Sequence, residues 1–427
     1  MARIALTKPT ACAGEVVMPG DKSVSHRIVM LAAIARGQTE IVNLNRGEDV
    51  GRTTKAMTSV GAIVKPKEHA LVVHGVDELH DPTDPIDCGN SGTTMRLLMG
   101  LLAGRVQATL DGDASLRRRP MERIAEPLRL MGAEIETSAD GRAPVSLRGQ
   151  AALRGIDFRA AVASAQLKSA VLFAGLHAEG ATNVSVAIAT RDHTERMLAA
   201  MHAPVGFGGP TVSIRRGELD AIPRYDVPGD LSAAAFFLTA AAALPGFQLV
   251  VRDVGINPTR GAVVDALRAM GAKISIRNAR IAHDEPRADI EVRGGAHLRG
   301  ISIGGSAVPA LIDELPVLCA LGAIAGGEFA VRGAGELRLK ESDRLAATAA
   351  MLRAFGAEVE DLPDGLVVRR SSPLQAPELI SAGGDHRIGM AAAALAAALR
   401  QPLVIDDAEC IATSFPEFEK TWSQAFA

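Results

Sequence analysis

Residues 269–275 read AMGAKIS, and this stretch decides the fold because related copies of it recur along the chain. In each copy the pattern predicts an amphipathic helix that stops at a glycine and leads into a short strand. The other copies are SVGAIV (59–64), LMGAEIE (130–136), AMHAPV (200–205) and AFGAEVE (354–360). Their landmark positions are separated by 71, 70, 69 and 85 residues, and they are Gly61, Gly132, His202, Gly271 and Gly356. A helix predicted at 418–426 follows about one period later, and such regular spacing indicates a repeated module.

A second kind of segment alternates with the first. It begins with a polar loop that contains glycine, continues as a strongly apolar helix and usually closes with another glycine. Helices that are apolar on every side have to be buried. The six segments are 22–37, 90–104, 164–180, 229–246, 312–327 and 384–402. The alternation predicts an α/β fold of six βαβαββ-like repeats, with right-handed crossovers between parallel strands.

Three repeats per domain predict two domains, one formed by residues 1–20 plus 229–427 and the other by residues 21–228. Because the apolar helices have to be buried, we expect them inside the sheets rather than outside. The alternative is that Gly-Ala helix stops recur by coincidence in an alanine-rich chain.

The composition of the 427 residues excludes several classes of protein. The net charge is only -3 and aromatic residues make up 3%, so neither a basic field nor a set of stacking rings is available to bind nucleic acid. The longest apolar run, 233–247, is interrupted by Pro245 and is too short to span a membrane. No secretory signal is visible, so we expect a cytoplasmic protein that contacts neither nucleic acid nor membrane.

Cysteine and histidine usage argues against metal sites and disulfides. The four cysteines contain no C-x-x-C pair, and they are Cys12, Cys88, Cys319 and Cys410. Their scatter is typical of a reducing compartment. Three histidines near helix starts lack the spacing of metal ligands, and they are His26, His193 and His386. We therefore expect no metal and no cofactor.

The functional signal is positive charge at the starts of the predicted helices. A cation there meets the positive end of the helix dipole, which is unfavourable by about 0.3–1 kcal/mol. Recurrence at many helix starts indicates a bound anion that compensates. The cations are Lys22, Arg27, Arg96, Arg117, Arg118, Arg119, Lys168, Arg191, Lys340, Arg344 and Arg387. Taken singly, Lys168 and Arg117 are expected to be solvated surface cations. Simple helix capping is an alternative role for Asp21, Asp230 and Asp385, and it is the one expected for Asp385 alone.

Spacing adds geometry to this signal. Lys340, Glu341 and Arg344 lie at i, i+1 and i+4, so we expect them to share one sector of a helix. Arg119 precedes Pro120, which should hold the arginine extended and start the next helix. Standing alone, residues 340–344 could equally form a surface ion-pair network.

These residues resemble the enolpyruvyl transferase family, and within it the second subclass of the 5-enolpyruvylshikimate-3-phosphate synthases. Ten motifs carry the resemblance in order along the whole chain: GDKSVSHR, GNSGTTMR, RRRPM, SAQLKSA, RDHTE, GDLSAA, IDELP, LKESDRL, GDHRIGMA and TSFPEF. The resemblance implies a two-domain inside-out α/β barrel, three repeats per domain, with the active site in the cleft between the domains. It implies the substrates shikimate 3-phosphate and phosphoenolpyruvate, no cofactor, and a monomer.

The resemblance also implies a role for individual residues. Those implied for shikimate 3-phosphate are Lys22, Ser23, Arg27, Ser164, Ala165, Gln166, Arg191, Asp313 and Lys340. Those implied for phosphoenolpyruvate are Lys22, Asn90, Gly92, Thr93, Arg119, Gln166, Arg344, His386 and Arg387. Asp313 matches the base for the 5-hydroxyl and Glu341 the proton donor to the methylene carbon, with Lys22 also catalytic. Two carboxylates among cations suit this chemistry, because their environments can separate their pKa values.

Some positions depart from the best-known pattern of the family. Ala165 stands where serine is common, Arg191 replaces a tyrosine-containing loop, Glu336 replaces asparagine and Thr413 replaces lysine. In this family the herbicide glyphosate occupies the phosphoenolpyruvate pocket, and tolerant members often carry alanine at the position of Gly92. The resemblance therefore implies inhibition by glyphosate.

Two alternatives stay open at the level of sequence. The sister enzymes that use UDP-N-acetylglucosamine share the fold, but they have asparagine after the first-motif lysine, where this chain has Ser23. They also usually have a cysteine before the Arg-Pro step, and residues 113–118 contain none. A non-catalytic protein that binds phosphometabolites would need the cations but neither Asp313 nor Glu341.

Overall fold

The computed structural model describes residues 2–10, 14–295, 297–370 and 373–426, so Cys12 lies outside the described part. Contacts between Cα atoms divide the chain into two compact units. Unit 1 comprises residues 1–19, 228–281 and 286–427, and unit 2 comprises residues 20–227 and 282–285. Each unit has its own hydrophobic core.

Unit 2 shows the predicted repeat in its simplest form. One repeat runs β6 (Ile86–Asp87), α3 (Gly92–Leu102), β7 (Ala108–Asp111), α4 (Glu122–Leu130), β8 (Ile135–Glu136) and β9 (Val145–Leu147). The sheet order is β6-β7-β9-β8, with β6 parallel to β7 and β9 antiparallel to both of its neighbours. This is a βαβαββ unit.

Two further repeats, one in each unit, have the same order of strands and of longer helices. The repeat in unit 2 contains β10 (Asp157–Ala160), α5 (Ala165–Gly175), β11 (Ala181–Val186), α6 (His193–Ala200), β12 (Val205–Gly206) and β13 (Thr211–Arg215). The repeat in unit 1 has two additional short helices, α9 and η2, and it contains β18 (Ser302–Ile303), α9 (Ala307–Leu311), α10 (Leu315–Ile324), β19 (Glu328–Val331), η2 (Gly335–Leu339), α11 (Arg344–Ala354), β20 (Glu358–Leu362) and β21 (Gly365–Arg369). Both sheets repeat the pairing pattern of β6-β7-β9-β8.

Two repeats exchange their first strands where the chain passes from one unit to the other. Strand β2 (Glu15–Val17) precedes α1 (Lys22–Ala32) but pairs in parallel with β15 (Gln248–Gly255) of unit 1. Strand β14 (Arg224–Asp226) precedes α7 (Leu231–Ala243) but pairs in parallel with β3 (Gln38–Val42) of unit 2. The elements that complete these repeats are α2 (Glu48–Ser59), β4 (Ile63–Pro66), β5 (Ala70–His74), α8 (Ala262–Ala269), β16 (Lys273–Ala282) and β17 (Glu285–Arg293).

The last repeat is shorter and is completed from the start of the chain. It contains β22 (Leu379–Ser381), α12 (His386–Ala398), β23 (Leu403–Asp406), η3 (Ala408–Thr413) and α13 (Phe418–Ala425). Strand β1 (Ile4–Leu6) pairs antiparallel with β23 and forms the third strand of that sheet.

The landmark positions found in the sequence mark helix ends with left-handed backbone. Gly61, Gly132, Gly271 and Gly356 have φ angles of 101°, 99°, 102° and 85°, and His202 has a φ angle of 60°. Glycine adopts these angles without the clash that a Cβ atom causes. The predicted helix stops are thus confirmed at all five positions.

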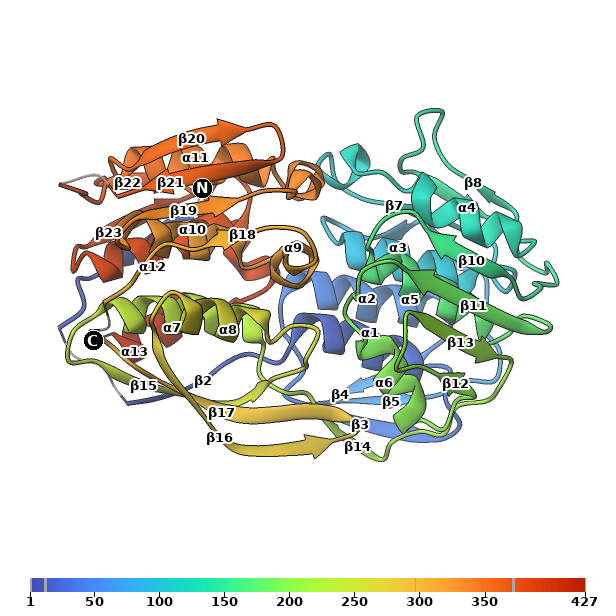
Figure 1. Ribbon diagram of the computed structural model, residues 1–427. Coiled ribbons are helices and arrows are strands. Elements are labelled where there is room, and N and C mark those ends of the chain that lie inside the picture. Colours follow the sequence, from blue (N-terminus) through green and yellow to red (C-terminus); the bar gives the residue numbers. More distant parts are fainter. Residues whose placement is uncertain (1, 11–13, 296, 371–372, 427) are drawn as a thin grey trace. The chain divides into compact units, whose positions relative to one another are not determined.

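The apolar helices are buried inside the sheets, as the sequence predicts. Helix α7 is buried from Leu231 to Ala242 on every side, and it packs against α10 and α12. In Figure 1 these three helices lie between the sheet that contains β19–β21 and the sheet that contains β15–β17. The inside-out arrangement of helices within a unit is therefore confirmed.

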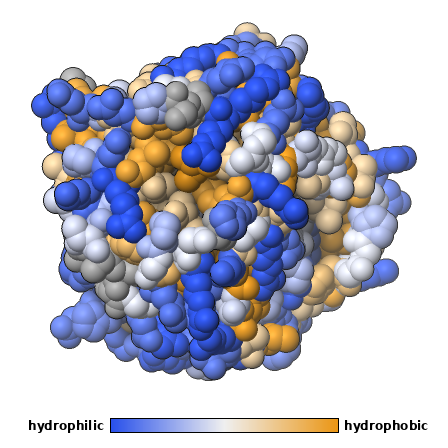
Figure 2. Space-filling model, turned by 60° about the vertical axis from the view of Figure 1, so that its left-hand side comes forward, coloured by the Kyte–Doolittle hydropathy of each residue, from blue (hydrophilic) through white to orange (hydrophobic). Residues whose placement is uncertain are grey.

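The described part of the chain contains no helix long and apolar enough to cross a membrane. Large exposed apolar side chains are spread over both units, with Ile281 and Val17 among the most exposed. The face drawn in Figure 2 is mainly hydrophilic and carries smaller apolar areas.

The tip of the β16–β17 hairpin belongs to unit 2, although most of the hairpin belongs to unit 1. His283 at this tip stacks on the ring of Tyr225, with ring centroids 4.8 Å apart. Glu285 Oε1 lies 2.6 Å from His193 Nδ1 at the start of α6, and both side chains are buried. The main-chain carbonyl of Asp284 accepts a hydrogen bond from Arg196.

Candidate active-site residues

The predicted site residues form one cluster in each unit, and each cluster is described by itself. The unit 2 cluster lies at the N-termini of α1, α3 and α5 and in the loop before α6. Its helices start where short polar side chains cap them: Asp21 accepts from Val24 N, Ser91 from Thr94 N and Ser164 from Leu167 N. These caps explain why polar loops change abruptly into apolar helices.

Arg27 is the buried centre of the unit 2 cluster. Its Nε donates to Thr194 Oγ1 at 2.7 Å, Nη1 to the carbonyl of Ser23 at 2.9 Å and Nη2 to Ser169 Oγ at 2.8 Å. All three acceptors are neutral. Burial lowers the pKa of Arg27 to about 10, and the charge of Glu195 opposes this shift. A buried guanidinium held by neutral oxygens is suited to an anionic ligand.

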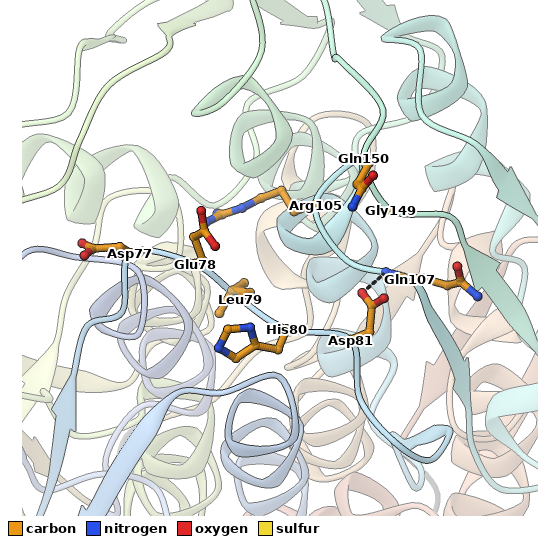
Figure 3. Close-up of a pocket in the computed structure, with 9 residues that line it drawn as sticks. All are labelled: Asp77, Glu78, Leu79, His80, Asp81, Arg105, Gln107, Gly149 and Gln150. Carbon is orange, nitrogen blue, oxygen red and sulfur yellow. Dashed lines mark hydrogen bonds between the residues drawn. The ribbon is translucent and has the colours of Figure 1, made fainter.

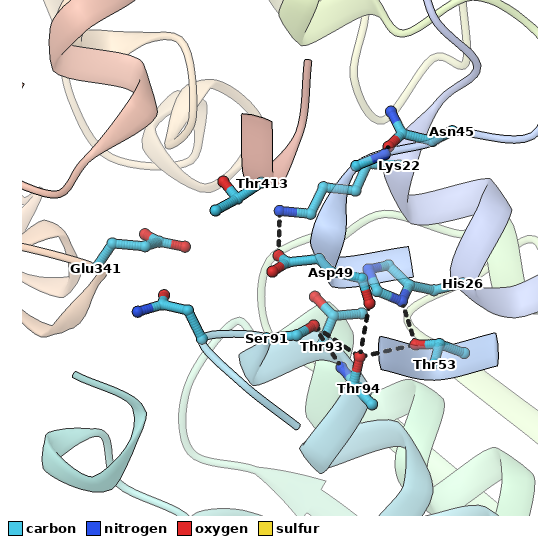
Figure 4. A network of polar contacts seen from close by, with 12 residues as sticks. Lys22, His26, Asn45, Asp49, Thr53, Ser91, Thr93, Thr94, Glu341 and Thr413 are labelled. Atoms are coloured by element: carbon cyan, nitrogen blue, oxygen red, sulfur yellow. Dashed lines mark hydrogen bonds and ion pairs between the residues drawn. The ribbon is translucent and has the colours of Figure 1, made fainter. Parts of the chain in front are cut away.

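Lys22 lies at the first position of α1 and forms an ion pair with Asp49 of α2. A chain of polar contacts lies beside it (Figure 4): His26 Nδ1 is 2.6 Å from Thr53 Oγ1, and Thr53 Oγ1 is 2.7 Å from Thr94 Oγ1. Burial lowers the pKa of His26 well below its usual value, and the charges of Lys22 and Arg27 add to this. His26 is therefore neutral and serves as a structural partner of Thr53.

The start of α3 joins Gln166 to two arginines. Gln166 Oε1 accepts from Arg96 Nη1 at 2.7 Å, and Gln166 Nε2 donates to Thr93 Oγ1 at 2.9 Å. Arg119 is buried and donates to Asn90 Oδ1. A Cβ atom added to Gly92 would lie 3.1 Å from Arg96 Nη1 and 3.2 Å from Arg119 Nη1. Gly92 is thus the point on which both guanidinium groups converge.

Lys168 corrects an expectation from the sequence. It is not a solvated surface cation, because its side chain is 4% exposed and forms an ion pair with Glu195, which is 1% exposed. Burial raises the pKa of Glu195, and Lys168 opposes that shift. Arg117, by contrast, is exposed as expected and pairs with Asp111.

The unit 1 cluster is centred on Arg344, which is 1% exposed. Its Nε lies 2.7 Å from Asp385 Oδ2, its Nη1 lies 3.2 Å from Asp313 Oδ1 and its Nη2 contacts Glu341. Burial acts to lower the pKa of Arg344, but the charges of Asp385, Glu341 and Asp313 outweigh burial and raise it. The two predicted acid–base carboxylates therefore share one buried cation.

Arg387 of α12 also contacts Asp313. Its Nη1 donates to the carbonyl of Asp313 at 3.0 Å, and its Nε lies 3.5 Å from Asp313 Oδ1. His386 is the buried first residue of that helix. Asp385 is the expected cap, since it accepts from Arg387 N at 3.0 Å, and it also pairs with Arg344. Helix capping alone would not explain why Asp385 also pairs with Arg344.

The expectation that Lys340, Glu341 and Arg344 share a sector of one helix is wrong. Helix α11 begins at Arg344, and Asp343 caps it by accepting from Ala346 N. Lys340 and Glu341 lie in the turn before this cap, after the short helix η2. Glu341 reaches Arg344 from that turn rather than along a helix face. Similarly, Pro120 does not begin a helix, because α4 starts at Glu122.

Some site residues were not assigned a role from the sequence. The sequence singles out Arg96 only as one of the helix-start cations, although its i, i+4 spacing from Gly92 is a usable signal. Asp49 and Glu195 lie 27 residues from their partners Lys22 and Lys168, so no local spacing indicates either pair.

A cavity of about 690 Å³ in unit 2 contains none of the predicted site residues. Figure 3 shows it between the loops that follow β5, α3 and β9, and it is lined by Asp77, Glu78, Leu79, His80, Asp81, Arg105, Gln107, Gly149 and Gln150. The predicted residues gather at the opposite end of α3. Among the described residues, no group of three or more His, Cys, Asp or Glu is arranged to hold a metal ion.

Comparisons with known proteins identify the same family as the motifs do. Residues 6–422 match the family described as EPSP synthase (3-phosphoshikimate 1-carboxyvinyltransferase). A 3-phosphoshikimate 1-carboxyvinyltransferase of Pelotomaculum thermopropionicum is 47% identical over 410 residues, which cover 95% of this chain and 94% of the relative. One from Methylococcus capsulatus is 48% identical over 411 residues, covering 95% and 93%.

Solved structures agree with the sequence relatives. EPSP synthase of Acinetobacter baumannii superposes with a TM-score of 0.86 at 42% identity, covering 100% of this chain and 98% of that one. The enolpyruvyl transferase NikO of Streptomyces tendae superposes with a TM-score of 0.77 at 18% identity, covering 99% and 96%, and shows a shared fold. The chain therefore belongs to the EPSP synthase (3-phosphoshikimate 1-carboxyvinyltransferase) family.

Proposed function

We propose that this enzyme transfers the enolpyruvyl group of phosphoenolpyruvate to the 5-hydroxyl of shikimate 3-phosphate and releases phosphate. The single observation that carries the proposal is the group around Arg344, where Asp313 and Glu341 contact one buried guanidinium. This is the carboxylate pair that an addition–elimination reaction requires, in a chain that belongs to the family.

The shikimate 3-phosphate is proposed to bind through the unit 2 cluster. Arg27 supplies a buried positive charge whose three contacts are neutral oxygens. Beside it on α1, Ser23 and Lys22 offer a hydroxyl and an ammonium, and the first turn of α5 offers free main-chain N–H groups. The remaining proposed contacts are Ser164, Ala165, Gln166 and Arg191, with Asp313 and Lys340 from unit 1.

Phosphoenolpyruvate is proposed to bind through guanidinium groups, which match a carboxylate or a phosphate with paired N–H donors. Its proposed contacts are Lys22, Asn90, Gly92, Thr93, Arg119, Gln166, Arg344, His386 and Arg387. All three guanidinium nitrogen atoms of Arg344 face carboxylates. An incoming anion must therefore take the place of Asp313 or Glu341 at Arg344.

This exchange would prepare the two carboxylates for catalysis. Once displaced from Arg344, Asp313 can accept the proton of the 5-hydroxyl as its oxygen attacks C2 of phosphoenolpyruvate. Glu341 delivers a proton to C3, which gives a tetrahedral ketal phosphate. Elimination then removes a proton from the new methyl group while the C–O bond to phosphate breaks. Each proton transfer uses a side chain of the pair, in the manner of general acid–base catalysis.

The proposal is tested by phosphate release from phosphoenolpyruvate with shikimate 3-phosphate, run beside UDP-N-acetylglucosamine. We expect release with shikimate 3-phosphate only. Release with the nucleotide sugar alone would assign the chain to the sister reaction. Binding of shikimate 3-phosphate without any release would indicate a binding protein. A monomeric state and a cytoplasmic location stay predictions from the sequence.

A further inference from the structure

The Lys168–Glu195 ion pair lies deep in unit 2 and takes no part in the reaction described above. Its side chains are 4% and 1% exposed. Glu195 Oε2 is buried and makes no hydrogen bond within the described part of the chain. Replacing a buried ion pair with apolar groups of similar volume is often neutral or stabilising. A contribution to folding stability therefore explains the presence of this buried ion pair poorly.

The contacts of Lys168 connect two parts of the unit 2 cluster. Lys168 lies on the first turn of α5, the helix that begins with Ser164, Ala165 and Gln166. Its Nζ is 3.5 Å from the main-chain carbonyl of Thr190, the residue directly before Arg191. Lys168 therefore ties the start of α5 to the loop that carries Arg191.

Glu195 connects the pair to Arg27. Within the described residues the three hydrogen-bond acceptors of Arg27 are neutral, and the strongest interaction of this guanidinium with a negative charge is the one with Glu195. Thr194, the neighbour of Glu195 on α6, accepts from Arg27 Nε and shares a 2.7 Å contact with Ser169 of α5. The same turn of α6 thus fixes both the geometry and the charge balance around Arg27.

We propose that the Lys168–Glu195 pair is a positioning device for the shikimate 3-phosphate site: Lys168 holds the Arg191 loop through the carbonyl of Thr190, and Glu195 balances the charge of Arg27. The inference rests on the proposed function, because it assigns Arg27 and Arg191 to that substrate. Neither member of the pair touches a reacting atom. Their loss should therefore weaken the binding of one substrate and leave the chemical step nearly unchanged.

The test separates positioning from stability by removing both charges together. Lys168→Met alone leaves Glu195 buried without its partner, and Glu195→Gln alone leaves Lys168 in that state, so both single variants should unfold at lower temperature. The double variant keeps the side-chain volumes and leaves neither member of the pair as a buried charge without its partner. We expect it to regain most of the wild-type melting temperature.

The kinetic readout then decides the role. In the double variant we expect the KM for shikimate 3-phosphate to rise by about tenfold or more, as for the loss of a hydrogen bond to a charged group. The KM for phosphoenolpyruvate and kcat should change little. The matched control is Arg129→Met with Glu122→Gln, an exposed ion pair of unit 2, which should alter neither constant.

Three outcomes would overturn the inference. One is a stable double variant with the wild-type KM for shikimate 3-phosphate, and another is an equal rise in KM for both substrates. The third is a wild-type protein that binds no shikimate 3-phosphate in calorimetry, which would overturn the proposed function as well. If the wild-type protein binds shikimate 3-phosphate and the double variant keeps the wild-type KM, the inference is overturned but the proposed function stands.

Discussion

Gly92→Ala adds one methyl group at the place where two guanidinium groups converge. The new Cβ atom would lie 3.1 Å from Arg96 Nη1 and 3.2 Å from Arg119 Nη1, closer than ordinary van der Waals contact. Both neighbours are the far ends of flexible side chains, so each has to move by only a few tenths of an ångström. Alanine is also a better helix former than glycine, by up to about 1 kcal/mol. We therefore expect no loss of thermal stability.

The effect on ligands should be larger for the inhibitor than for the substrate. Glyphosate is longer than phosphoenolpyruvate, so it should lose more when Arg119 shifts and the pocket becomes shallower. One methyl group changes such a discrimination by about 1–3 kcal/mol, or roughly 10–200-fold. We expect competitive inhibition of the wild-type enzyme, and a rise in the inhibition constant of Gly92→Ala that exceeds the rise in the KM for phosphoenolpyruvate.

The assay is phosphate release at varied phosphoenolpyruvate and glyphosate concentrations. Gly51→Ala is the matched control, because Gly51 also lies in the first turn of a helix and an added Cβ atom there meets no atom within 4 Å. The control should leave both constants unchanged. Equal proportional changes of the two constants in Gly92→Ala would show that residue 92 does not line the phosphoenolpyruvate pocket.

Four further variants test other parts of the structure. Asp313→Asn and Glu341→Gln should each lower kcat by about 10²–10⁴-fold in steady-state assays while shikimate 3-phosphate still binds, and near-normal turnover in both would reject the acid–base assignment. Arg344→Met leaves the buried carboxylate of Asp385 without its cation, so it should cost about 3–5 kcal/mol of folding stability, and a melting temperature within about 2 °C of wild type would contradict this. Burial lowers the pKa of His177 from 6.5 to about 4. The neutral side chain therefore contributes fully to folding stability above pH 6.5, and this contribution is lost as the pH falls toward 4. Between pH 6.5 and pH 4 the free energy of unfolding, measured with urea, should therefore fall by roughly 3 kcal/mol less in His177→Gln than in the wild type. An unchanged pH dependence would refute the role of His177.

The repeated architecture could be predicted because its signals are local. These helices end at left-handed residues, and Gly61, Gly132, His202 and Gly271 supply them at a spacing of 69–71 residues. The apolar helices carry no polar face, so burial inside the sheets followed directly from their sequence. Helix capping by Asp385 was equally readable, because a cap acts within two or three residues.

The errors have two causes, a partner that lies far away in the sequence and a helix cap that charge spacing does not reveal. The burial of Lys168 depends on Glu195, which lies on another helix. Charge spacing alone places Lys340 and Glu341 on the same helix as Arg344, whereas the cap at Asp343 fixes Arg344 as the first helical residue. The domain boundaries and the roles of individual residues stay predictions until the variants are measured.

The exchange of strands between the units has a consequence for the order of synthesis. Strand β2 is among the first elements to leave the ribosome, but its partner β15 follows more than 230 residues later. At about 5–20 residues per second, β2 waits for roughly 10–50 seconds. Residues 20–227 emerge during that interval, so unit 2 can gather most of its core before unit 1 has any partner for β2. A released chain that ends near residue 230 should therefore resist protease within 20–227 while residues 14–19 are cut.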